Sequence, residues 1–254
     1  MGIDGAPTTQ FLSFHAPIQK KNIGLGLKIV NDQAAVIKNF SAEGMFSYAL
    51  GLGSGKLSAG IETGIINQST DFTNLIRHDA TDNVLTNDKQ TKTTFDLSFG
   101  LFYQTKTFFM GWSSYQLTKS EINYTGASRS MIARLWNHNI GIIGYNFGTE
   151  EKLRFEPSIL IKQVANVPLQ FDVNFRGTYK QLVSLGVSYR NSESIVFMTD
   201  VIINDSFKVG YAFDYTISGL ADYQSGGHEV MFTYRKKLLP PARDKETHPR
   251  FYIY

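Results

Sequence analysis

Apolar and polar residues alternate along most of this chain with a period of two. Between Phe207 and Ser218 the odd positions are apolar or aromatic, whereas the even positions are Lys, Gly, Ala, Asp, Thr and Ser. Similar alternation runs through residues 23–30, 57–65, 95–104, 169–176 and 183–190. A period of two places successive side chains on opposite faces of a strand. The chain is therefore predicted to consist of β-strands, and no comparable stretch keeps the 3.6-residue period of an amphipathic helix.

Thirteen strands are expected, and most are 9–13 residues long. Strands of soluble proteins usually have about 5–6 residues, whereas tilted membrane strands have about 9–11. Their length, and the aromatic residues near so many strand ends, favour an all-β, antiparallel up-and-down transmembrane β-barrel over a soluble sandwich. The expected strands are residues 8–18, 23–32, 40–52, 57–69, 93–104, 107–117, 130–147, 153–164, 167–179, 182–190, 194–203, 206–218 and 227–237.

The connections between the first strands alternate in length. Residues 19–22, 53–56 and 105–106 are short turns, and residues 33–39, 70–92 and 118–129 are longer connections; each set is expected at one end of the barrel. Outer-membrane barrels have short periplasmic turns and longer outer loops, so the short turns are assigned to the periplasm. Residues 1–238 are then the barrel, and residues 239–254 are a periplasmic tail that follows two strand-ending prolines.

Because the strand 8–18 ends at a short periplasmic turn, it must run from the outside toward the periplasm. The 13 expected strands then begin outside and end in the periplasm, which is an odd number. Bacterial single-chain barrels have an even number. We therefore expect 14 strands in the complete protein, with one strand and a signal peptide ahead of Met1, because residues 1–10 lack the basic and apolar regions of a signal peptide. An odd barrel is the alternative.

Composition excludes several other classes of protein. The chain has no cysteine, a net charge of +3 and 13% aromatic residues. These values argue against a disulfide scaffold or thiolate metal site, a nucleic-acid protein and a disordered chain. A membrane helix needs about 20 mostly apolar residues, and the longest stretches without Asp, Glu, Lys or Arg have 15.

No pattern in the chain predicts catalysis, a cofactor or a metal site. The five histidines are dispersed, and the phosphate-loop-like segment 51–56 lacks the required first glycine, since Leu50 stands there. No nucleophile elbow is present. The protein is expected not to be an enzyme.

Charged residues of the polar set are expected to face the barrel lumen in a structural role, as partners of one another. They are Lys28, Glu43, Glu62, Asp96, Arg154, Glu156, Lys162, Asp172, Arg176, Arg190, Lys208, Asp214 and Glu229.

The tail combines basic and aromatic residues, which are frequent anchors of protein interfaces. It is interpreted as a docking peptide for a periplasmic partner. Two alternatives are a solvated tail and a tail that folds back over the periplasmic mouth. The candidate docking residues are Arg243, Lys245, Arg250, Phe251, Tyr252 and Tyr254.

Several segments together resemble one family. Lys208–Ser218, followed by Ser225–Val230, resembles the end of the PorP/SprF family of type IX secretion system outer-membrane proteins. Gly2–Gln10, Leu25-Gly26 with Asn31-Asp32, and Pro249–Tyr252 are also similar to that family. The chain departs from the family pattern at the front, where the signal peptide, the first strand and a tryptophan are absent.

The resemblance implies a non-enzymatic barrel of the Gram-negative outer membrane, without cofactor, that works in type IX protein secretion and gliding motility. Its implied partners are membrane lipid, periplasmic ring subunits and secreted, adhesin-like surface cargo, and no nucleic acid. His228 and Glu229 match a family motif and are interpreted as a partly buried lumen pair beside Asp214. The residues themselves leave two alternatives open, a general or substrate-specific pore lined by Gly, Ser and balanced charges, and a soluble β-sandwich binding module.

Overall fold

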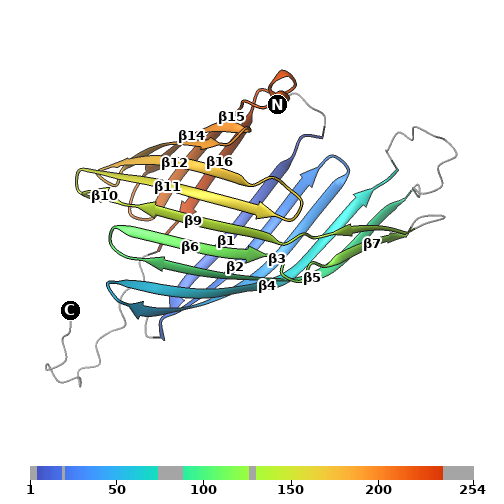
Figure 1. Cartoon of the computed structure of the whole chain (residues 1–254), viewed down its shortest axis with the longest axis horizontal. Helices are drawn as coiled ribbons and strands as arrows, with labels where there is room; N and C mark the ends of the chain where they lie inside the picture. Colours follow the sequence, from blue (N-terminus) through green and yellow to red (C-terminus); the bar gives the residue numbers. More distant parts are fainter. Residues whose placement is uncertain (1–4, 19–20, 74–87, 126–129, 237–254) are drawn as a thin grey trace.

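The computed structural model describes residues 5–18, 21–73, 88–125 and 130–236, and these residues are almost entirely β-strand (Figure 1). One 3₁₀ turn, η2 (Gly219–Asp222), interrupts the strands. The strands are β1 (Thr8–Ile18), β2 (Ile23–Ala34), β3 (Ile37–Leu52), β4 (Gly55–Asp71), β5 (Lys89–Gln104), β6 (Phe108–Tyr115), β7 (Glu121–Thr125), β8 (Ser130–Arg134), β9 (His138–Tyr145), β10 (Phe147–Gly148), β11 (Leu153–Val164), β12 (Gln170–Tyr179), β13 (Val183–Arg190), β14 (Ser194–Ile202), β15 (Phe207–Thr216) and β16 (Gly227–Tyr234).

The strands form an up-and-down antiparallel meander, as the sequence predicts. Along the described chain, the main sheet runs β1-β2-β3-β4-β5-β6-β9-β11-β12-β13-β14-β15-β16, and the short β10 pairs with β11 beside this path. Every neighbouring pair is antiparallel, for example Lys28 opposite Glu43 and Asp172 opposite Arg190. The all-β, up-and-down prediction is confirmed, and each predicted strand corresponds to one strand of this path.

Two local predictions are wrong. The predicted strand 130–147 is divided into β8, β9 and the first residue of β10, with an irregular segment at residues 135–137. β8 pairs with β7 as a separate hairpin. The predicted longer connection 33–39 is a two-residue turn, because the β2–β3 ladder continues to Ala34 opposite Ile37. Ala35 makes this tight turn by adopting a positive φ of 49°, a conformation in which turn residues reverse the chain.

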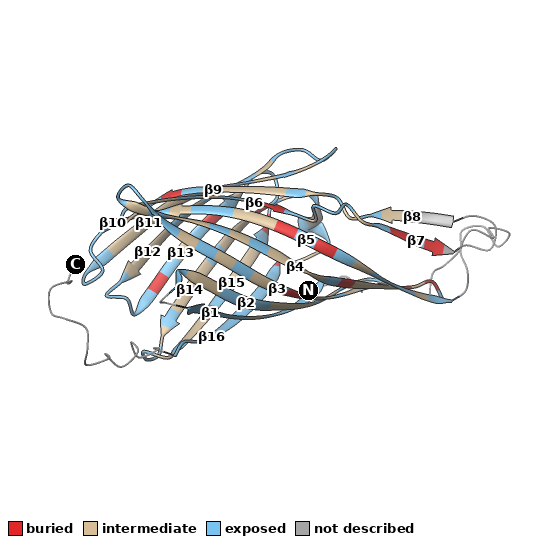
Figure 2. Cartoon of the chain, turned by 90° about the horizontal axis from the view of Figure 1, so that it is seen from below, coloured by how far each residue is buried: buried red, intermediate tan, exposed pale blue. Residues whose placement is uncertain are grey.

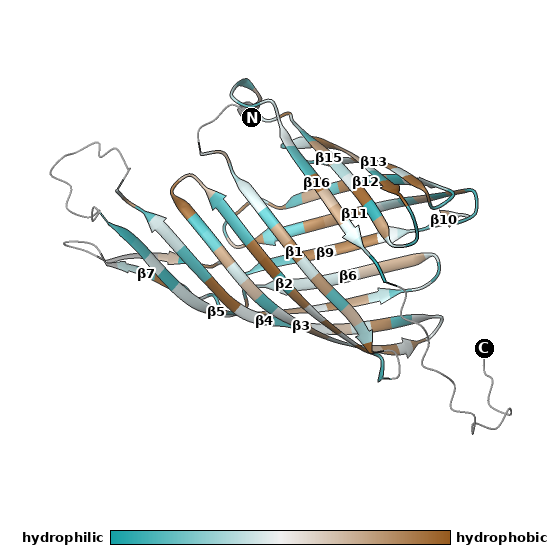
Figure 3. Cartoon of the chain, turned by 180° about the vertical axis from the view of Figure 1, so that it is seen from behind, coloured by the Kyte–Doolittle hydropathy of each residue, from teal (hydrophilic) through white to brown (hydrophobic). Residues whose placement is uncertain are grey.

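Burial is inverted relative to a soluble protein. Within the described ranges the buried apolar side chains are few, whereas Glu43, Asp96 and Asp172 are all buried. Large apolar side chains such as Leu185 and Phe197 are instead more than half exposed. Figure 2 shows that buried positions are scattered through the wall, and Figure 3 shows hydrophobic and hydrophilic residues interspersed along the strands. This inversion is expected of a barrel whose outer face contacts lipid and whose interior is polar.

The sheet curls until its first and last strands lie near one another (Figures 1 and 3). In the described part of the chain β1 and β16 form no backbone ladder with each other, so a seam separates them. No helix among the described residues has the length and apolar character of a membrane-spanning helix. We call the end of the sheet with the turns 53–54, 105–107 and 203–206 the turn rim, and the opposite end the loop rim.

At the loop rim, β5 extends beyond its neighbour β6, and β4 and β5 carry the β7–β8 hairpin on a small apolar cluster. Phe72, Ile122 and Tyr124 form this cluster, and the rings of Phe72 and Tyr124 meet edge to face at 5.6 Å between centroids. The Tyr124 hydroxyl lies 2.6 Å from Gln68 Oε1 and 2.9 Å from Thr70 Oγ1. The cluster therefore fixes the hairpin to β4 through both apolar contact and hydrogen bonds.

Replacing Tyr124 by phenylalanine is expected to loosen the hairpin. The change keeps the ring but leaves the buried Thr70 hydroxyl without this partner, and an orphaned buried polar group costs about 1–3 kcal/mol. Amide hydrogen exchange within residues 121–125 and 130–134 should accelerate by tenfold or more. Tyr145→Phe, on a half-exposed ring of β9, is the control. Equal exchange in Tyr124→Phe and the parent protein would contradict this role of the hydroxyl.

Candidate functional site: charged clusters on one face of the sheet

Strand alternation gathers most of the predicted charged residues on one face of the sheet, which we call the charged face. Residues opposite one another in an antiparallel ladder point to the same side. Lys28 lies opposite Glu43, Glu43 opposite Gly64, and Gly64 opposite Asp96, so these positions share a face across β2 to β5. The same rule joins Asp172, Arg190 and Ser194 from β12 to β14.

The first cluster places one cation among three carboxylates. Lys28 forms ion pairs with Glu43 and with Glu62, the latter at 2.7 Å between Nζ and Oε1. The Lys28 ammonium also lies 5.8 Å from the ring centroid of Tyr115, within cation–π range. Asp96, which is buried, accepts a hydrogen bond of 3.1 Å from the Thr118 hydroxyl.

Gly64 is the residue that permits this cluster to close. A Cβ at this position would lie 2.1 Å from the Ala42 carbonyl oxygen and 2.6 Å from Glu43 Cα. Both neighbours are backbone atoms, so neither can move aside without displacing β3. The glycine is required here for the close approach of β3 and β4.

The second cluster is centred on Arg190 and spans β11 to β15. Arg190 Nε lies 3.4 Å from Asp172 Oδ1, and its Nη1 lies 3.3 Å from Asp214 Oδ2 and 3.3 Å from Glu193 Oε1. Lys162 Nζ reaches the other oxygen of Asp172 at 3.3 Å. This network links strands that are far apart in the sequence through charge-assisted contacts.

A third group lies nearer the turn rim. Asp200 on β14 pairs with Arg176 on β12 and with Lys208 on β15, the latter at 3.1 Å between Nζ and Oδ1. Arg154 pairs with Glu156 at 3.5 Å. Asp200 was missed by the sequence analysis, although Ile195, Phe197 and Val201 make the odd positions of its strand mainly apolar, which places the even-numbered Asp200 on the opposite face.

The structure thus brings together the predicted charged residues in three groups, with one exception. Glu229 is exposed, lies opposite Ala212, and has no ion pair among those found in the described ranges. The interpretation of His228 and Glu229 as a lumen pair is wrong for His228. Its ring lies opposite Phe213, and its Nδ1 is 2.8 Å from the Tyr211 hydroxyl, on the other face. Successive residues of a strand cannot share a face.

This arrangement pairs cations with carboxylates across neighbouring strands. The cations contact carboxylates, and within the described residues no group of three or more His, Asp or Glu side chains is placed to hold a metal ion. Paired charges of this kind tolerate a low-dielectric wall because each offsets the desolvation of its neighbour. The clusters therefore join strands within the wall.

Comparison with known protein families matches residues 1–234 to the type IX secretion system membrane protein PorP/SprF. The chain belongs to the PorP/SprF family. The resemblance inferred from the residue motifs is thereby confirmed, and the PorP/SprF match covers every described strand. A search of curated proteins gave no match.

The candidate docking residues of the tail lie outside the described residues, and they also lie beyond the residues matched to PorP/SprF. Docking of Arg243, Lys245, Arg250, Phe251, Tyr252 and Tyr254 to a partner remains a prediction.

Proposed function

We propose that this PorP/SprF protein is an outer-membrane β-barrel of the type IX secretion and gliding machinery. In this role it links secreted, adhesin-like surface cargo to ring subunits on the periplasmic side, and its action is structural rather than enzymatic. The observation that carries the proposal is the family match, which spans the whole described meander.

The geometry supports a stiff barrel wall that could connect partners on the two sides of the membrane. Ion pairs centred on Lys28 and Arg190 join strands on both halves of the sheet, so the charged face is stiffened across several strands. We propose that this face lines the lumen and that the apolar face contacts lipid, as in other polar-lined barrels.

The two rims offer different surfaces to partners. The loop rim carries the β7–β8 hairpin on its apolar cluster and is proposed to meet cargo at the cell surface. The turn rim has short connections and is proposed to face the periplasmic ring.

Co-purification from outer membranes tests the proposal. An affinity-tagged version of the protein, expressed in the bacterium that encodes it, is expected to retain periplasmic ring subunits and surface cargo after mild detergent extraction. In a strain that lacks the protein, the same cargo should be missing from the cell surface. An unrelated outer-membrane barrel with the same tag is the control. Cargo display unchanged by the deletion, together with no specific co-purification, would contradict the proposed function.

A further inference from the structure

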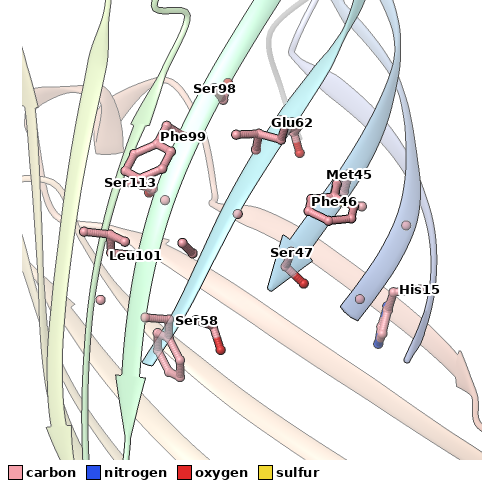
Figure 4. A pocket seen from close by; sticks show the side chains of 18 of the residues that line it. His15, Met45, Phe46, Ser47, Ser58, Glu62, Ser98, Phe99, Leu101 and Ser113 are labelled. Carbon is pink, nitrogen blue, oxygen red and sulfur yellow. The ribbon is translucent and has the colours of Figure 1, made fainter. Parts of the chain in front are cut away.

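A hollow of about 680 Å³ lies against the wall formed by β1 to β6, β9 and β11. Small residues of the charged face, among them Gly24, Ser47, Ser58 and Gly100, leave the space open. Figure 4 shows side chains from β3, β4 and β5 around this space, including Ser47, Ser58 and Ser98. Larger apolar side chains complete the lining, namely Met45, Phe102, Ile140, Ile142 and Leu160.

This hollow is unusual for its position, because its lining is mostly apolar although the face around it carries the ion pairs. Barrel interiors are generally polar, and an exposed apolar patch rimmed by polar residues marks a binding site. Lys28 brings one positive charge against Glu43, Glu62 and Asp96, and Glu62 is itself part of the lining. The hollow is thus suited to an apolar, aromatic occupant that also carries positive charge.

The tail of the same chain has this chemistry. Residues 250–254 are Arg-Phe-Tyr-Ile-Tyr, so an arginine directly precedes four large apolar or aromatic residues. Phenylalanine and isoleucine suit the apolar lining, and tyrosine adds a hydroxyl that can bond to the serines there.

The tail begins at the same rim of the sheet at which the hollow lies. β16 ends with Tyr234 opposite Phe207, at the turn rim, and it lies across the seam from β1. The hollow includes Pro17 near the end of β1 and Phe102 near the end of β5, which belong to the same rim.

The distance is within reach of the tail. Neighbouring strands are about 4.8 Å apart, so the path from β16 along the wall to β4 is roughly 20–25 Å. Residues 237–250 span up to about 45 Å when extended, at about 3.3 Å per residue.

We propose that residues 251–254 occupy the hollow of their own barrel, with Arg250 beside Glu62. Of the arrangements that the sequence leaves open, this proposal favours a tail that folds back onto its own barrel over a tail that docks to a partner. It does not depend on the proposed role in secretion.

Cysteine crosslinking tests the proposal directly, because the chain has no cysteine of its own. Ser58→Cys is combined with Tyr252→Cys, and the protein is oxidised in outer membranes. An intrachain disulfide is expected, seen as a faster band without reductant and as a linked peptide by mass spectrometry. The matched control combines Tyr252→Cys with Ser184→Cys, which lies on the charged face of β13, near the turn rim but outside the lining of the hollow.

Two further variants keep the test decisive. Ser113→Cys, also in the lining, replaces Ser58→Cys if that variant fails to give a heat-modifiable barrel. Ser47→Trp, which fills part of the hollow, should reduce the disulfide yield at least fivefold in the crosslinking background. The proposal is overturned if the hollow and control pairs crosslink equally, or if the thiol introduced by Tyr252→Cys crosslinks only to a partner protein or to a second copy.

Discussion

Replacing Lys28 by methionine is expected to be among the most destabilising single substitutions in the barrel. The change leaves Glu43 and Glu62 without their shared cation, next to the buried Asp96. Removing one partner of a buried ion pair costs about 3–5 kcal/mol, because an uncompensated charge remains. The free energy of unfolding, measured by urea titration of the protein in liposomes, should fall by about this amount.

Two companion variants separate the lost ion pair from a general effect of the substitution. Lys92→Met removes an exposed lysine from the charged face of β5. It should change the free energy of unfolding by about 0.5 kcal/mol or less. Adding Glu43→Gln to Lys28→Met should recover part of the loss, since one unpaired charge is then removed. A Lys28→Met variant as stable as the Lys92→Met variant would show that the cluster does not stabilise the wall.

Replacing Val209 by arginine is expected to impair insertion of the barrel. Val209 on β15 lies between Val201 of β14 and Phe232 of β16, on the apolar face. A charge on the lipid face costs up to about 2–4 kcal/mol at the middle of the bilayer and less toward the interfaces, and Val209 is the third residue of β15.

Lys208→Arg is the matched control for this substitution, because it keeps a cation beside Asp200 on the opposite face. The free energy of unfolding in liposomes should fall for Val209→Arg and stay near the parent value for Lys208→Arg. If both variants fold equally well, the assignment of the two faces of β15 is wrong.

Much of the fold was accessible from the sequence because strand alternation is a local property. The alternation from Phe207 onward gives the facing of β15 without any knowledge of its neighbours, and the charged residues of the polar set follow from the same rule. Which cation meets which carboxylate depends on the register between strands. The pairing of Lys28 with Glu43 and the role of Asp200 were therefore visible only in the structure.

The errors have local physical causes. Ala35 adopts a positive φ although it is neither glycine nor asparagine. The residue types of this turn therefore do not signal the tight β2–β3 connection. The break at residues 135–137 separates β8 from β9 because β8 pairs with β7 outside the main sheet. His228 and Glu229 were assigned to one face from their motif, although successive residues of a strand point to opposite faces, and His228 shares the face of Phe213.

We propose that this PorP/SprF chain spans the membrane with its apolar face in lipid and its charged face toward the barrel lumen. Single cysteines at residues 208–215 of β15, labelled in isolated outer membranes with a charged maleimide, test it most directly. The account predicts reaction at even positions such as Ala212 and Asp214, and protection at odd positions such as Tyr211 and Phe213, with a period of two. Uniform labelling along the strand, or recovery of the protein outside the outer-membrane fraction, would contradict it.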